Sequence, residues 1–129
     1  MHPFRAAIEA RDMDAAAALL SEDVVFRSPL VFKPYHGRAA AGQLLRAVSH
    51  VFEDFRYTRD IVGPDAVDHV FVFRARVGKF ELEGSDFLHH DEDGLIDELV
   101  VMVRPLSAAL ALGEAMKVQL AAEEGDAGT

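Results

Sequence analysis

The sequence predicts a single α+β domain with one antiparallel sheet, in which helices come early in the chain and strands come late. Three observations support this fold class. Apolar and polar residues alternate from His69 to Arg104, short turn sequences divide that stretch, and apolar residues recur at helical spacing before and after it. A chain of 129 residues is long enough for one hydrophobic core and too short for two.

The alternating stretch contains three strands, at residues 69–77, 80–90 and 95–104. Gly78-Lys79 separates the first two, and glycine at the first position of a two-residue loop is typical of a type II′ hairpin. The acidic turn Asp91-Glu92-Asp93-Gly94 separates the second and third strands. We therefore expect three consecutive antiparallel strands.

The Gly78-Lys79 loop also predicts the register of the first hairpin. It places Arg76 opposite Glu81 and Arg74 opposite Glu83, which gives two pairs of opposite charge. A shift of one residue would lose both pairs, so they support this register. The same register places Asp86 opposite Phe71.

Alternation assigns the side chains of these strands to two faces. The inner face is apolar except for one carboxylate, and it comprises Phe71, Phe73, Ala75, Leu82, Gly84, Asp86, Leu88, Leu99, Val101 and Val103. The outer face combines charged residues with an apolar patch, which we call the outer patch, formed by Val70, Val72, Phe87, Val100 and Met102. We expect helices and a pocket to cover the inner face, and a second copy of the chain to cover the outer patch in a homodimer.

The remaining elements follow from periodicity and from breaking residues. The sequence predicts helices at 4–10, 14–20, 39–52 and 106–122, and strands at 24–28 and 55–62. The strand at 24–28 ends before Pro29. The domain is expected to span residues 1–122, and the polar segment 123–129 is expected to be a disordered tail.

Composition excludes several classes of protein. A net charge of −9 argues against nucleic acid and anionic membranes as partners. The absence of cysteine excludes disulfides, a thiolate nucleophile and cysteine-ligated metal. The N-terminus has no secretory apolar segment, and no apolar run approaches the roughly 18 residues of a membrane span. We expect a cytoplasmic protein.

The segment SEDVVFRSPLVFKPYHGRAAAGQLLRAV, followed by four meandering strands, resembles the nuclear transport factor two-like superfamily and in particular its SnoaL-like branch. The resemblance covers about residues 3–105 and includes a short helix pair, an H-G-R entry to the third helix and a D-x-D-G turn. It implies a cone-shaped α+β barrel in which a curved antiparallel sheet wraps around a long helix and leaves a pocket at the open end. Members are commonly homodimers that pair through the outer face of the sheet.

This superfamily includes ketosteroid isomerases, epoxide hydrolases, polyketide cyclases and non-catalytic binding proteins, so fold alone does not decide function. The isomerases use a tyrosine on the first helix and two aspartates, and the matching positions here are Phe4, Ser28 and Asp86. The limonene-type epoxide hydrolases use Arg-x-Asp and a further aspartate, which correspond to Gly84, Asp86 and Val101. Neither catalytic set is complete, and Asp86 alone is retained.

Asp86 is therefore the candidate catalytic residue. Burial on an apolar face raises the pKa of a carboxyl, which would suit a general acid or base, and SnoaL-like cyclases are similar in relying on one pocket aspartate. Alternatively, a neighbouring hydroxyl, amide or water satisfies Asp86 and it performs no chemistry. The residues expected to line the pocket are Phe4, Phe26, Ser28, Tyr35, His36, Phe55, Tyr57, Phe71, Phe73, Gly84, Leu88, Leu99 and Val101.

The sequence gives no reason to expect a metal or an organic cofactor. His89 and His90 are adjacent on a strand and point to opposite faces, so they do not easily share an ion. Three functional hypotheses follow: a cofactor-independent isomerase, cyclase, hydrolase or lyase acting on a small hydrophobic or aromatic molecule, a non-catalytic binding module for such a molecule, or a dimerisation module with a filled core.

Overall fold

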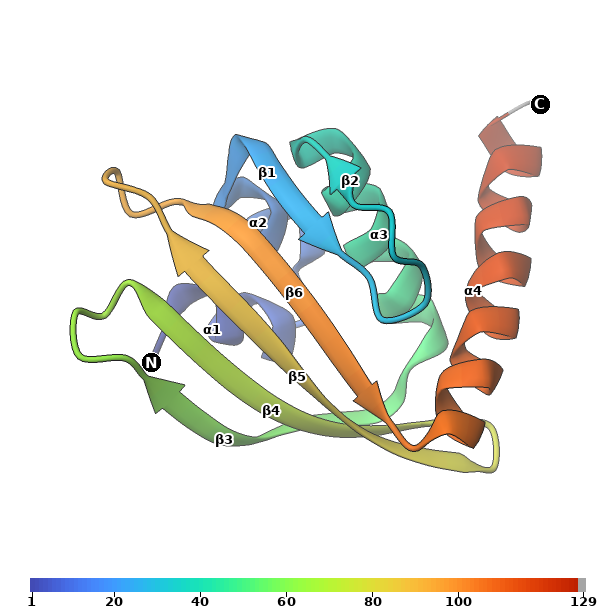
Figure 1. The fold of residues 1–129 in the computed structure, drawn as a ribbon. Coiled ribbons are helices and arrows are strands. Elements are labelled where there is room, and N and C mark those ends of the chain that lie inside the picture. Colours follow the sequence, from blue (N-terminus) through green and yellow to red (C-terminus); the bar gives the residue numbers. More distant parts are fainter. Residues whose placement is uncertain (128–129) are drawn as a thin grey trace.

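The computed structural model describes residues 1–127, and side chains up to residue 124. The elements are α1 (Pro3–Glu9), α2 (Met13–Ala18), β1 (Leu20–Arg27), β2 (Tyr35–His36), α3 (Arg38–Val51), β3 (Glu53–Val62), β4 (Asp68–Val77), β5 (Phe80–His90), β6 (Ile96–Arg104) and α4 (Leu106–Ala127). The predicted α+β class is confirmed (Figure 1). None of the helices among the described residues is both long and apolar enough to cross a membrane.

The six strands form one curved, open sheet in the order β2-β1-β6-β5-β4-β3. Neighbouring strands are antiparallel except β1 and β6, which pair in parallel with Phe26 beside Leu99. The sequence predicted antiparallel pairing throughout and did not predict the short strand β2. The parallel pair joins strands that are distant in the chain, so no turn between them reveals their direction.

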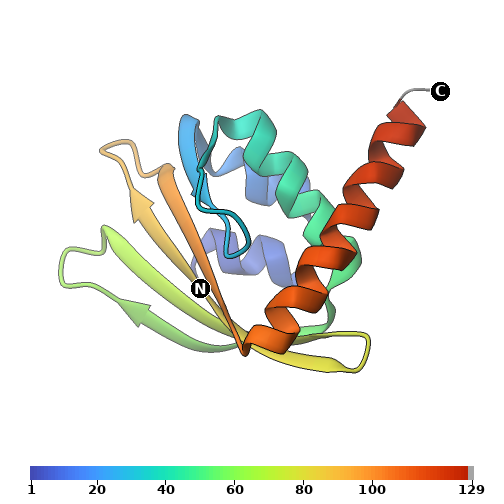
Figure 2. The same ribbon diagram turned by 45° about the vertical axis from the view of Figure 1, so that its right-hand side comes forward.

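The helices gather on one side of the sheet (Figure 2). Helix α3 turns Ala41 and Leu45 into the core, where they meet inward residues of the strands such as Phe71 and Phe73. Helix α4 follows β6 and packs against α3 through Leu112 and Met116, which are buried together with Ala47. The sheet, α3 and α4 therefore enclose a common interior.

The predicted register of the first hairpin is confirmed. Phe71 pairs with Asp86, Arg74 pairs with Glu83, and Gly78 has a φ of 59°, which the turn between β4 and β5 requires. The Arg74 and Glu83 side chains lie 3.6 Å apart. The inner face is buried as expected except at Val101 and Val103, which are partly buried, and the outer patch is partly exposed.

One predicted ion pair has different partners. Arg76 lies opposite Glu81 in the register, but its guanidinium contacts the carboxylates of Glu53 and Asp54, each at 2.7 Å. Both acidic residues belong to β3, which runs along the other side of β4. The sequence alone did not place β3 beside β4. It therefore did not predict that Glu53 and Asp54 would contact Arg76 in place of Glu81.

Several element boundaries differ from the predictions. Helix α2 ends at Ala18 and β1 begins at Leu20, because Leu20 is fully buried and pairs with Ile96 of β6. Helix α4 continues to Ala127, beyond the predicted end at Ala122. Residues 128 and 129 of the predicted tail lie outside the described residues.

Gly84 lies at the closest approach between a strand and an aromatic ring. A Cβ atom at this position would collide with the ring of Phe73 and would lie 2.8 Å from the carbonyl oxygen of Met102. Phe73 is itself buried, and its neighbours Phe52 and Phe55 limit how far the ring can move. Only glycine fits beneath Phe73.

We therefore expect Gly84→Ala to lower the free energy of unfolding by about 1–3 kcal/mol, because overpacking displaces a core ring. Denaturant unfolding monitored by circular dichroism measures this change. Ser85→Ala, the next residue and on the outer face, is the matched control and should change stability much less. Equal stabilities for Gly84→Ala and the wild type would show that Phe73 moves without cost.

Candidate functional site

A cavity of about 510 Å³ lies between the inner face of the sheet and helices α1, α3 and α4. Its wall is mostly apolar, with aromatic rings from Phe4, Phe26, Phe52, Phe55 and Phe73. Asp86 is the one carboxylate among the described lining residues. A cavity of this size and character suits a small apolar molecule.

Strand β5 points Asp86 into this cavity. Its partner residues in the neighbouring strands are Phe71 and Val101, and the side chain is buried, with the residue 9% exposed. The hydroxyl of Tyr57 donates a hydrogen bond to Asp86 Oδ2 at 3.0 Å. Among the described residues Oδ1 has no hydrogen-bond partner, so it is available to a molecule in the cavity.

This environment changes the acidity of both groups. Burial raises the pKa of Asp86 from its ordinary 3.8 to about 7, although the hydrogen bond from Tyr57 acts in the opposite direction. Burial and the neighbouring Asp86 charge raise the pKa of Tyr57, which stays protonated. The pair therefore contains one permanent donor and one carboxyl that exists in both forms near neutral pH.

Tyr57 was predicted to line the pocket, but its bond to Asp86 was not. Tyr57 pairs with Phe73 on β4, and the register of β3 shifts on either side of this position. Such irregularities are not visible in the alternation of residue types. Alternation along the strand, which places Tyr57 on the inner side, was the only sequence signal for this contact.

The structure brings most of the predicted pocket residues together. Those that line the cavity are Phe4, Phe26, Ser28, Tyr35, Phe55, Tyr57, Phe73, Asp86, Leu99 and Val101. The predicted residues that do not line it are His36, Phe71, Gly84 and Leu88. The absence of each of these four residues from the cavity wall has a physical reason.

His36 is exposed, because it follows the inward-facing Tyr35 on a strand and so points away. Gly84 lies beneath the ring of Phe73. Phe71 and Leu88 are fully buried members of the hydrophobic core. They pack in the core and do not face the cavity.

The cavity also has walls that the sequence did not assign. Helix α3 contributes Leu44, Leu45 and Val48, Phe52 directly follows α3, and α4 contributes Leu112, Met116 and Leu120. The apolar positions of α3 and α4 are visible in the sequence, but which elements those faces meet depends on the tertiary packing.

Two positions that carry catalytic groups in related isomerases do not carry them here. Phe4 has no donor, and it is buried in the cavity wall. The Ser28 hydroxyl accepts the backbone N–H of Leu30 at 2.9 Å, and it has no histidine partner. Among the described lining residues, Asp86 is thus the one carboxylate, and Tyr57 is its hydrogen-bond partner.

The structure also shows which histidines could hold a metal. His89 points outward and bonds to Asp97 at 2.7 Å, which raises the pKa of His89, whereas His90 points inward. The two side chains thus point to opposite faces of the sheet, as alternation along a strand predicts. Unexpectedly, His90 meets His69 and His2, and one ring nitrogen from each lies within 4.8 Å of the others.

These features define a class: an open α+β cone with an apolar interior cavity and one acidic group. Residues 2–99 match the model of the SnoaL-like domain. The chain belongs to the SnoaL-like family, and it shares the fold of nuclear transport factor two-like proteins. The predicted family and fold are thus confirmed.

Solved structures give the same assignment. A steroid Δ-isomerase from Pseudomonas aeruginosa is 43% identical, with a TM-score of 0.90 over 93% of this chain and 88% of that one. A protein with a cystatin-like fold from Silicibacter pomeroyi is 33% identical, with a TM-score of 0.83 over 92% and 86% of the two chains. An epoxide hydrolase/cyclase-like enzyme of pyran ring formation in salinomycin shares the fold at 15% identity, with a TM-score of 0.66 over 81% and 87%. Comparison with curated protein sequences gave no match.

The raised pKa of Asp86 predicts a specific pH dependence of stability. Between pH 4 and 7 the folded protein holds a proton on Asp86 that the unfolded chain has lost, so this contribution to stability falls as the pH rises. Asp86→Asn removes the titration. Relative to the wild type, the variant should gain stability from pH 4 to 8, by up to a few kcal/mol at about 1.4 kcal/mol per pKa unit.

Chemical denaturation at a series of pH values measures this difference. Asp65→Asn, at an exposed position, serves as the matched control and should keep the pH dependence of the wild type. A stability difference between Asp86→Asn and the wild type that is the same at every pH would contradict the raised pKa of Asp86.

Proposed function

We propose that this chain binds a small apolar molecule in its cavity and moves a proton on that molecule, with Asp86 as the acid and base. The observation that carries the proposal is the Tyr57–Asp86 pair, which combines a 3.0 Å hydrogen bond with an apolar cavity wall. No organic cofactor is required for this chemistry. The absence of cysteine is compatible with a cytoplasmic location, which we also propose.

The acidity of Asp86 supports this role. A group with a pKa of about 7 both accepts and donates a proton at neutral pH, which is the requirement for general acid–base catalysis. Tyr57 holds Oδ2 and stabilises the carboxylate after a proton has been given up. Oδ1 then faces the ligand.

The substrate class follows from the cavity and from similarity. The wall offers apolar and aromatic contacts to most of a ligand and one acidic group at a single position, which suits an apolar compound with one carbonyl. The similar protein from Pseudomonas aeruginosa is described as a steroid Δ-isomerase. We therefore propose an apolar ketone of steroid-like size, on which Asp86 removes and returns a proton beside the carbonyl.

The proposed mechanism differs from that of ketosteroid isomerases in its groups. Phe4 and Ser28 stand where those enzymes have a tyrosine and a basic aspartate, so Asp86 would be the sole carboxyl. Removal of a proton from the carbon beside the carbonyl gives an enolate and a neutral Asp86, and return of this proton to the same or a conjugated carbon completes the cycle. Tyr57 donates its hydrogen bond to Asp86 Oδ2 beside the reacting oxygen.

Proton exchange tests this proposal without knowledge of the product. We expect the protein to accelerate the exchange of protons beside the carbonyl of a Δ5-3-ketosteroid in D₂O, measured by NMR. Asp86→Asn should lower the rate about 10²- to 10⁴-fold, which is the usual contribution of a general base. Ser85→Ala, next to Asp86 on the outer face of β5 and outside the cavity lining, is the matched control and should retain most of the activity.

Tyr57→Phe provides a second readout. The hydrogen bond from Tyr57 lowers the pKa of Asp86, so its loss should move the rise in exchange rate to higher pH. An Asp86→Asn variant with unchanged exchange would remove Asp86 from the mechanism.

The alternative function is binding of the same kind of molecule without chemistry. One observation favours it: Ser28, at the position of the second acid–base group, has its hydroxyl bonded to the backbone. In that case a ketosteroid would bind to the wild type and to Asp86→Asn, and neither protein would accelerate exchange. A dimerisation module with a filled core is less well supported, because the cavity of about 510 Å³ reaches Asp86.

We further propose that the chain forms a homodimer through the outer patch. Val70, Phe87 and Val100 lie side by side on three neighbouring strands, and Met102 extends this surface. Phe87 is 36% exposed and Met102 is 55% exposed. Contiguous exposed apolar groups of this kind are typical of a protein interface.

A measured mass in solution tests the dimer. We expect twice the chain mass by light scattering, and Phe87→Asp should give a monomer because it places a charge within the apolar interface. Val118→Asp, on the exposed side of α4 where Val118 is 68% exposed, should leave the mass unchanged. A wild-type monomer at high concentration would contradict the outer-patch dimer.

A further inference from the structure

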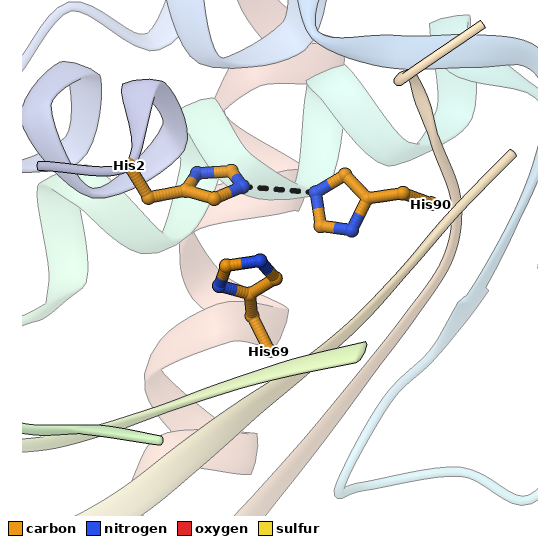
Figure 3. Close-up of side chains that lie close together, drawn as sticks. All are labelled: His2, His69 and His90. Atoms are coloured by element: carbon orange, nitrogen blue, oxygen red, sulfur yellow. Dashed lines mark hydrogen bonds between the residues drawn. The ribbon is translucent and has the colours of Figure 1, made fainter. Parts of the chain in front are cut away.

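Three histidines from distant parts of the sequence meet beside the buried ring of Phe71. His2 precedes α1, His69 lies on β4, and His90 ends β5 (Figure 3). The three rings face one another, and one ring nitrogen from each lies within 4.8 Å of the others. All three residues are partly buried, and none lines the cavity that contains Asp86.

Hydrogen bonds to the backbone orient His90 toward its neighbours. Its Nδ1 donates to the carbonyl of Val67 at 2.8 Å, so Nε2 carries the lone pair and lies 2.9 Å from Nε2 of His2. A bond from the second ring nitrogen to a backbone carbonyl is the usual support of a metal-binding histidine, because it selects the tautomer and holds the ring.

His69 adds an unsatisfied donor atom. Its Nε2 lies 3.2 Å from the carbonyl of Ala66, whereas its Nδ1 is buried and has no hydrogen-bond partner among the described residues. A buried nitrogen without a partner is costly in a filled interior. The lone pair on His69 Nδ1 thus receives no hydrogen bond from the described residues.

We propose that His2, His69 and His90 bind one divalent transition-metal ion of the Zn²⁺ type. Imidazole nitrogen is a preferred ligand for zinc, copper and nickel, and three histidines leave a coordination position for water. Two ligands at a zinc–nitrogen distance of about 2.0–2.1 Å in a tetrahedron are about 3.3 Å apart. The two Nε2 atoms of His2 and His90 are 2.9 Å apart, and no two ligand nitrogens of the cluster are more than 4.8 Å apart. These distances lie on either side of 3.3 Å, so small side-chain movements complete the site.

One charged side chain of opposite sign to a cation lies near the cluster. The carboxylate of Asp60 acts electrostatically on the ring of His2, and the amino group of Met1 acts on it in the opposite sense.

Metal binding is coupled to the start of α1. In the structure Nδ1 of His2 accepts the N–H of Phe4 at 3.0 Å, so the proton of the ring is on Nε2, from which it is donated to His90. Coordination through Nε2 moves this proton to Nδ1 and ends the bond to Phe4, with no net release of a proton. The ion would connect His2, at the start of α1, to His69 on β4 and His90 on β5. Because Phe4 of α1 lines the cavity, metal binding would affect the wall of the proposed binding site.

Titration of the untagged, full-length chain with ZnCl₂ tests the site. Isothermal calorimetry in a non-chelating buffer should show saturable binding of one ion per chain. The melting temperature should rise with the zinc concentration, because the ion binds the folded state. The NMR signal of the Phe4 amide should shift as its acceptor is lost.

Variants identify the ligands while preserving the local hydrogen bonds. His2→Asn keeps an acceptor for the Phe4 amide, and His90→Asn keeps a donor for Val67, while His69→Gln removes the third imidazole. Each should lose the saturable binding and the rise in melting temperature. His89→Asn is the matched control on the same strand, and Asp86→Asn separates this site from the proposed reaction; both should bind zinc as the wild type does.

Absence of saturable binding to the wild type would overturn the proposal. Unchanged binding by the three cluster variants, or equal loss in His89→Asn, would overturn it as well. Circular dichroism of each variant without zinc identifies any loss of fold, and the variant that folds best among the three decides the result.

Discussion

The pairing of β4 with β5 is the constraint on which the rest of the structure depends. The tight turn at Gly78 fixes this pairing, and one face of the hairpin then carries Phe71, Phe73, Leu82 and Leu88 into the core. The same alternation makes Asp86 point inward among them. Burial of this carboxyl is a direct consequence of the register, since a shift of one residue would expose it and bury charged side chains instead.

A buried carboxyl needs a partner, a proton or a solvated space. Here Tyr57 is the hydrogen-bond partner of Asp86, and the raised pKa of Asp86 means that the carboxyl holds a proton up to near neutral pH. The cavity leaves space on the side of Asp86 that Tyr57 does not occupy. These three conditions are also the conditions for acid–base chemistry on a bound molecule. The stability problem that Asp86 creates and the function that we propose for it therefore have one physical origin.

Local pairing could be predicted from the sequence, and long-range pairing could not. The β4–β5 register follows from one turn and two charge pairs, so the inner face and the position of Asp86 were recovered residue by residue. The register of β3 contains irregularities, and β1 pairs with β6 in parallel across most of the chain. No local signal encodes either arrangement, and for this reason the Tyr57–Asp86 bond was missed.

The same distinction applies to the histidines. His69 and His90 lie near each other in neighbouring strands, but His2 joins them only through the packing of α1, and a residue at the start of a helix carries no periodic signal. Similarly, the apolar residues of α4 are visible in the sequence, whereas their place in the cavity wall depends on how α4 meets α3. Contacts between separate elements are the information that a single sequence does not display.

The last helix has a consequence for how specificity can change in this fold. The proposed acid–base pair belongs to β3 and β5, whereas Leu112, Met116 and Leu120 of α4 form one part of the wall of the same cavity. Substitutions at these three positions would reshape the space for the ligand without touching the strands that hold Asp86 and Tyr57. This part of the cavity shape can therefore diverge while the proposed chemistry stays the same.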